Sequence, residues 1–197
     1  MRARVAGFAI AGLAVAILVS GCAERTAGAA AIVGDDRISE RQLEEEVQEV
    51  LSAQGQPVGT ESSEVIASVL NRLVTESLID QLAVQEGVDV TEAQVDTTID
   101  IYAEAFGGEQ AIEDALVQQG IAPSQVRRVV RTNVLAESIG AALDPQGTPE
   151  SRASAVYEAV VELSVAEGTT ISPRYGTWDS QMLLIGPIPD DLSNPGS

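Results

Sequence analysis

SSEVIASVLNRLVTESLIDQLAVQEG, residues 62–87, is the clearest indication of how this chain folds. Its apolar side chains recur with the spacing of one face of an α-helix. The members of that face are Ile66, Val69, Leu70, Leu73, Val74, Ile79 and Leu82. Gly87 suits the end of the helix, because glycine adopts positive φ without a steric penalty. The segment therefore predicts a long helix with a broad apolar face.

Further helices are expected on both sides of this one, each marked by capping residues. Ser39-Glu40-Arg41-Gln42 and Thr91-Glu92-Ala93-Gln94 are capping boxes, in which the first hydroxyl accepts from the amide three residues later. Pro123 and Pro149 suit the first turns of two later helices, and Val156, Val160 and Leu163 are expected on the core side of the second. The expected helices cover residues 39–53, 62–86, 91–106, 109–118, 123–143 and 148–167.

Two extended pieces flank the helical block, Ala31–Val33 before it and Thr169–Trp178 after it. Because an isolated strand leaves its backbone amides without partners, the two are expected to pair. The predicted fold is therefore mainly α, a single domain of about six helices over residues 31–180, with a small antiparallel β ribbon joining its N- and C-terminal segments. The segment 181–197 mixes apolar residues with Gly, Pro and Asp, and it is expected to be a flexible tail.

Residues 1–21 are typical of a bacterial export signal, with two arginines before an apolar run too short for a comfortable membrane span. Val19-Ser20-Gly21-Cys22 resembles a lipobox, the site that the lipoprotein signal peptidase recognises. The resemblance implies cleavage before Cys22, lipid on its sulfur and a tether over residues 22–30. The protein is then expected on the extracytoplasmic face of the cell membrane. The alternative is an ordinary signal peptide next to an unrelated cysteine.

The composition excludes several kinds of chemistry. The 197 residues carry a net charge of −19, which repels the phosphates of nucleic acids and of anionic lipids. There is no histidine, and all 11 basic residues are arginine. The chain therefore has no imidazole for a nucleophile pair or a metal, and no lysine for a phosphate loop. We expect no catalytic residue, metal, cofactor or nucleic-acid partner, and a carboxylate-based hydrolase is the remaining enzymatic alternative.

Five residues are candidates for binding a polypeptide. Arg127, Arg128 and Arg131 form a basic cluster that suits a carboxylate terminus or an acidic segment. Alternatively, they balance nearby acids as surface ion pairs. Tyr175 and Trp178 either close the core or line a groove in which rigid rings anchor a partner.

The acidic run Glu44-Glu45-Glu46 is a weaker candidate, for a cation site. Consecutive side chains on a helix point in different directions, so three adjacent carboxylates do not converge on one ion. The run is therefore interpreted as a solvated helix face.

The order of these features resembles the SurA-like N-terminal, peptide-binding domain of periplasmic and lipoprotein chaperones. Besides the order of the helices, the likeness rests on Glu86-Gly87-Val88 followed by Val90-Thr91, and on the closing Ser172-Pro173-Arg174-Tyr175-Gly176-Thr177-Trp178. It covers roughly Ala31 to Asp179. The first turn differs, since Gly34-Asp35-Asp36 stands where family members often have Asn-Gly.

A parvulin prolyl-isomerase domain, which many family members carry, has no place in this chain. Only Asp144–Gly147 separates the two helices between which such a domain is inserted. The resemblance therefore implies a lipoprotein, held to the membrane through Cys22, that binds unfolded or extended exported polypeptides passively, without ATP and without isomerase activity. The alternative is a structural or adaptor lipoprotein with one dedicated envelope protein as its partner.

Overall fold

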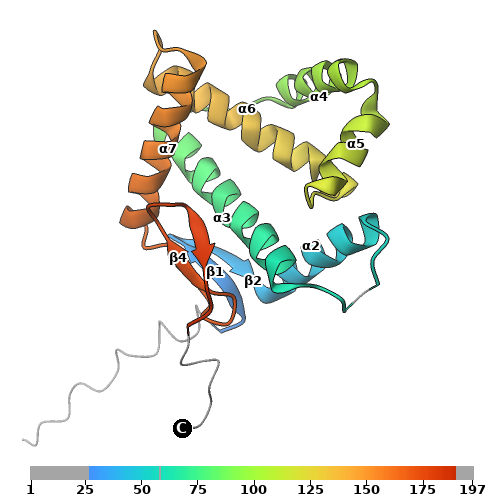
Figure 1. Ribbon diagram of the computed structural model, residues 1–197. Helices are drawn as coiled ribbons and strands as arrows, with labels where there is room; N and C mark the ends of the chain where they lie inside the picture. Colours follow the sequence, from blue (N-terminus) through green and yellow to red (C-terminus); the bar gives the residue numbers. More distant parts are fainter. Residues whose placement is uncertain (1–26, 58, 190–197) are drawn as a thin grey trace, which may run out of the picture.

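The computed structural model describes residues 27–57 and 59–189 (Figure 1). Its elements are β1 (Ala29–Val33), β2 (Asp36–Ser39), α2 (Glu40–Ala53), α3 (Ser63–Glu86), α4 (Glu92–Phe106), α5 (Glu109–Gln118), the 3-10 turn η1 (Pro123–Gln125), α6 (Val126–Leu143), α7 (Pro149–Ala166), β3 (Thr170–Ile171), β4 (Thr177–Asp179) and β5 (Leu184–Gly186). The prediction of a mainly helical fold with six helices and small antiparallel pairings is confirmed. Cys22 and the export signal lie outside the described residues.

The central helix α3 packs against α2, α6 and α7, and its inner face is almost entirely buried. In Figure 1 it crosses the middle of the molecule, with the sheets at one end and the α4–α5 pair on the far side of α6. The caps explain where the helices begin. Ser39 Oγ accepts from the amide of Gln42, and Thr91 with Gln94 forms a complete capping box. Gly87 ends α3 at φ 66°, as the sequence predicts.

The two ends of the domain meet in an antiparallel sheet with the strand order β2-β1-β3. β1 is the middle strand, and Ala31 lies opposite Ile38 on one side and Ile171 on the other. Pairing of Ala31–Val33 with the C-terminal segment is therefore confirmed at Ile171. The strand β2 was not expected, because no extended segment was predicted between the turn Gly34-Asp35-Asp36 and the helix that begins at residue 39.

The C-terminal segment forms a second hairpin, in which β4 pairs with β5 and Trp178 lies opposite Ile185. The prediction that Trp178 pairs with β1 is wrong, because the extended segment is interrupted by a turn closed between Ser172 and Tyr175. The prediction of a flexible tail from residue 181 is wrong for Leu184–Gly186, since these residues gain backbone partners in β4. Residues 190–197 lie outside the described part of the chain. At the other end, the tether predicted over 22–30 overlaps β1, which already begins at Ala29.

Helices α6 and α7 approach closely because Gly140 lies buried where they cross. A Cβ atom at this position would lie 3.1 Å from Arg152 Cβ and 3.3 Å from Val156 Cγ2. Only glycine allows this separation without a shift of α7. The crossing fixes the orientation of the α7 face that includes Val156.

Within the described ranges, no helix is both long enough and apolar enough to span a bilayer.

Candidate functional site

The most suitable binding site in the described structure is a groove between α3, α6 and α7, with a volume of about 670 Å³. Ile79, Val156 and Val160 are buried and form its apolar floor. The remaining lining residues are Thr75, Ala136, Glu137, Pro149, Arg152, Ala153, Tyr157 and Leu183. A concave, mainly aliphatic surface of this size with a few polar groups at its rim is what small ligands and peptide side chains occupy.

Tyr157 separates this groove from a second, more open hollow of about 620 Å³ on the other side of α7. Tyr157 is 46% exposed, and its hydroxyl donates to the carbonyl oxygen of Gln181 at 2.7 Å. Val161 and Val165 line the second hollow. Apolar surface therefore continues across α7 on both sides of one tyrosine, which suits an extended chain better than a compact ligand.

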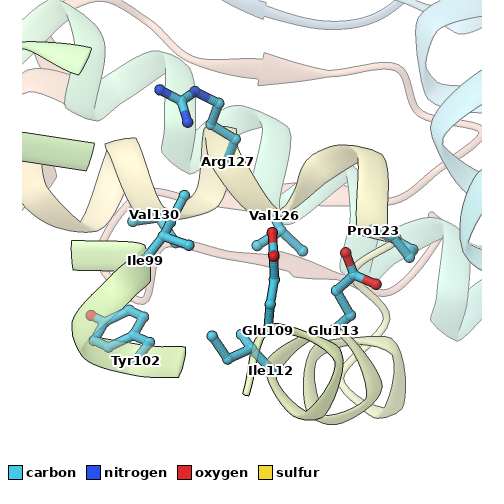
Figure 2. A pocket seen from close by; sticks show the side chains of 9 residues that line it. All are labelled: Ile99, Tyr102, Glu109, Ile112, Glu113, Pro123, Val126, Arg127 and Val130. Atoms are coloured by element: carbon cyan, nitrogen blue, oxygen red, sulfur yellow. The ribbon is translucent and has the colours of Figure 1, made fainter. Parts of the chain in front are cut away.

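A smaller hollow of about 210 Å³ lies between α4, α5 and the start of α6 (Figure 2). Tyr102 and Ile112 contribute its apolar side, and the carboxylates of Glu109 and Glu113 point toward Val126 and Pro123. The guanidinium of Arg127 points away from the cavity in this view. Its volume lies below the range of about 300–1,000 Å³ for ligand pockets, so the α3–α6–α7 groove is the stronger candidate.

Four charged side chains form a cluster that joins α2, α3 and α6: Glu46, Arg72, Glu76 and Arg128. Arg72 lies 3.2 Å from a carboxylate oxygen of each glutamate, and Arg128 lies 2.6 Å from Glu46 and 2.8 Å from Glu76. Burial raises the pKa of Glu76, although Arg128 and Arg72 act to lower it. Two positive and two negative charges balance one another here, so this ion-pair cluster holds helices together and leaves no charge for a ligand.

The three arginines predicted to bind peptide lie on α6 and are each engaged by a neighbouring helix. Arg127 donates to Glu92 and Asp96 on α4, and these hydrogen bonds raise its pKa. Arg131 lies 2.7 Å from Asp80 on α3, whereas Arg128 belongs to the ion-pair cluster. None of the three lines the α3–α6–α7 groove. A role for them in binding peptide stays a prediction, and it requires a peptide carboxylate to compete with these contacts.

Tyr175 and Trp178 are both half-buried, and both pack against the core. The indole N–H of Trp178 donates to Ser164 Oγ at 2.8 Å, which fixes the β4–β5 hairpin against α7. Tyr175 lines a separate hollow beside α2, where Arg174 lies 5.4 Å from the centre of its ring. The structure therefore does not bring these two rings together with the three arginines in one site, and the binding role of the two rings stays a prediction.

Sequence reasoning missed Tyr157, which lies on the exposed side of α7, and Leu183, which comes from the C-terminal loop. Val156 and Val160 were assigned correctly to the inner face of α7, and Tyr157 lies next to them in sequence. An aromatic ring flanking an apolar helical face was the available indication. Leu183 offered none, because its place depends on the unpredicted β4–β5 pairing.

In the described part of the chain, no group of acidic, histidine or cysteine side chains is arranged to hold a metal ion.

A family model described as SurA-like N-terminal domain matches residues 1–140. The match ends near the C-terminal end of α6, so α7 and the closing segment from Ser172 to Trp178 lie outside it. No curated protein and no solved structure matches this chain.

Proposed function

Because this chain belongs to the family of SurA-like N-terminal domains, we propose that it is a passive chaperone that binds extended or unfolded segments of exported polypeptides. Binding takes place in the α3–α6–α7 groove, without ATP and without prolyl isomerisation. The observation that carries this proposal is the aliphatic groove of about 670 Å³, whose apolar surface continues past Tyr157 along α7. An extended chain offers alternate side chains to such a surface.

We further propose that the protein is a lipoprotein, anchored through Cys22 on the extracytoplasmic face of the cell membrane. The support is the lipobox-like Val19-Ser20-Gly21-Cys22 at the end of an apolar leader. Mass spectrometry of protein isolated from membranes is expected to find Cys22 as the N-terminal residue, carrying diacylglycerol. Cys22→Ser should leave the leader uncleaved at this site. An unmodified N-terminus at another residue in the wild-type protein rules out the lipid anchor.

Filling the groove is the direct test of the chaperone proposal. Ala153 is exposed on α7 and lines the groove, so Ala153→Trp should place an indole where a client side chain binds. The assay follows light scattering by insulin B chain, released by a thiol reductant, with the protein held in lipid nanodiscs. The single cysteine excludes an intrachain disulfide that the reductant would break. The concentration of protein that halves the light scattering should be about tenfold higher for Ala153→Trp than for wild type. This difference corresponds to about 1.4 kcal/mol of binding energy.

Ser154→Trp is the matched control, because Ser154 is the next residue on the same helix, is also exposed and lines none of the hollows described above. It should suppress aggregation as the wild type does. If the two variants lose aggregation suppression equally, the groove is not the binding site. No suppression by the wild-type protein at molar excess, with its helices intact by circular dichroism, would overturn the chaperone proposal itself.

A further inference from the structure

One residue of the groove has an unfavourable backbone conformation. Leu183 has φ 50°, and in the described part of the chain every other residue with positive φ is a glycine. Leucine is disfavoured in this left-handed region because its Cβ approaches the following carbonyl oxygen. Such a conformation persists only where surrounding contacts hold it, and it is often found at binding sites.

The contacts that hold the loop lie on both sides of Leu183 and do not use its side chain. Asp179 accepts from the amides of Gln181 and Met182, at 2.9 and 3.0 Å. After the loop, the amide of Ile185 donates to Asn71 on α3 at 3.1 Å. The loop is therefore fixed at its two ends, while Leu183 packs against the core and lines the groove together with Ile79 and Val160. Removing this side chain from the groove does not require the hairpin to unfold.

The charges around the groove favour a cationic occupant. Arg152 is the basic residue of the lining, and its guanidinium donates to the carbonyl oxygens of Asp144 and Pro145 at 3.0 and 2.9 Å. The carboxylate of Glu137 on the opposite wall has no hydrogen bond or ion pair within the described structure, and the same holds for Glu158 and Glu162 across Tyr157. Along the two hollows, the three carboxylates therefore outnumber the single guanidinium, and the whole chain has a net charge of −19. This balance favours positively charged segments over acidic ones.

We propose that the α3–α6–α7 groove selects cationic segments that present an aliphatic side chain, and that Leu183, which forms part of the groove wall, is displaced when such a segment binds. The inference rests on the proposed chaperone function and adds the class of client and a wall residue that moves on binding. The buried floor of Ile79, Val156 and Val160 is aliphatic, which suits an aliphatic side chain of the client. Lys or Arg residues near it in the client would lie beside Glu137, Glu158 and Glu162.

The test uses two fluorescein-labelled peptides that alternate Leu and Ser and differ only in carrying Arg or Glu at both ends. Fluorescence anisotropy measures their binding to the nanodisc-held protein. Leu183→Gly removes the side chain and suits the left-handed backbone, so the Arg peptide should bind about tenfold tighter. Met182→Gly is the matched control, because Met182 is in the same loop, is exposed and does not line the groove. The Met182→Gly variant should bind the Arg peptide with the affinity of the wild type.

Each outcome bears on a different part of the proposal. Equal affinities of the wild type and Leu183→Gly would overturn displacement of Leu183. Binding of the Glu peptide as strong as that of the Arg peptide would overturn the selection of cationic clients. In both cases the chaperone proposal would stand if Ala153→Trp weakens the suppression of insulin aggregation and Ser154→Trp does not. If wild-type protein neither binds peptide nor suppresses aggregation, the chaperone proposal fails together with this inference.

Leu183→Asn provides a second variant should glycine loosen the hairpin. Asparagine tolerates the left-handed region, and its side chain does not fill an aliphatic site. Hydrogen exchange of the amides in 177–186 measures whether β4 and β5 remain paired. Tighter Arg-peptide binding by either variant with a protected hairpin supports displacement, and unchanged binding with a protected hairpin contradicts it.

Discussion

Replacement of Arg72 by methionine is expected to lower the free energy of unfolding by about 3–5 kcal/mol, the cost of breaking a buried ion pair by removing one partner. Arg72 lies between the carboxylates of Glu46 and Glu76, two residues that are each 7% exposed, and it also donates to Gln125 at 2.8 Å. Methionine keeps the length of the side chain but leaves both carboxylates with Arg128 alone. Urea denaturation followed by Trp178 fluorescence and by circular dichroism measures the loss.

A double variant distinguishes electrostatics from packing at this site. Glu76→Gln removes the carboxylate whose pKa burial raises, so Arg72→Met combined with Glu76→Gln should be less destabilised than Arg72→Met alone. Because the folded-state pKa of Glu76 lies above its ordinary value of 4.5, the folded protein takes up this proton first as the pH falls. The change that Glu76→Gln makes in the free energy of unfolding, relative to wild type, should therefore be more favourable at pH 7 than at pH 4. If Glu76→Gln instead becomes more stabilising relative to wild type as the pH falls, this account is wrong.

Gly176→Ala is expected to destabilise the β4–β5 hairpin through its backbone. Gly176 has φ +133°, a conformation available essentially to glycine alone, for which another residue loses about 1–3 kcal/mol. A Cβ atom here would also lie 2.3 Å from the carbonyl oxygen of Gly186 and 2.7 Å from Ile185 Cγ2. The two strands must separate, and the Trp178 indole then loses its bond to Ser164. A red shift of the single tryptophan's fluorescence and faster hydrogen exchange in 177–186 should follow.

Gly168→Ala is the control for positive φ without a collision. Gly168 has φ +64°, and a Cβ atom at this position meets no other atom within 4 Å. Alanine there should lower the free energy of unfolding by about 1–2 kcal/mol through its backbone conformation. The β4–β5 amides should stay protected from hydrogen exchange. If both variants leave the β4–β5 amides equally protected, the close approach of Gly176 to Gly186 does not hold this part of the fold.

The helices could be predicted because the residues that begin and end them act locally. Ser39, Thr91 and Gly87 work through contacts within one turn, so the sequence alone indicates where α2, α4 and α3 start or stop. The apolar face of α3 likewise follows from spacing. These features made the number of helices and most of their bounds predictable.

The strands β2 and β5 could not be predicted, because their stability depends on partners rather than on their own residues. Asp36–Ser39 has a single buried side chain, Ile38, and it becomes a strand only beside β1. Leu184–Gly186 is shorter still and pairs across a turn that contains the disfavoured Leu183. Such segments have no period from which a strand can be recognised.

The candidate site was only partly predictable for a related reason. The inner residues of α7 were expected from helical spacing, but the groove also needs Ile79 from α3 and Leu183 from the C-terminal loop. Arg128 was weighed as a surface pair, whereas its partners come from α2 and α3 and are buried. Which charges meet across distant helices is decided by packing angles that a single sequence does not reveal.

The position of β1 in the middle of its sheet has a consequence for the order of folding during synthesis. β1 is among the first parts of the domain to leave the ribosome, yet one of its two neighbours, Thr170–Ile171, is among the last. Until that neighbour emerges, the nascent chain exposes an open strand edge of the kind that promotes aggregation. The sheet can therefore close only after α7 and the segment Thr170–Ile171 have been translated.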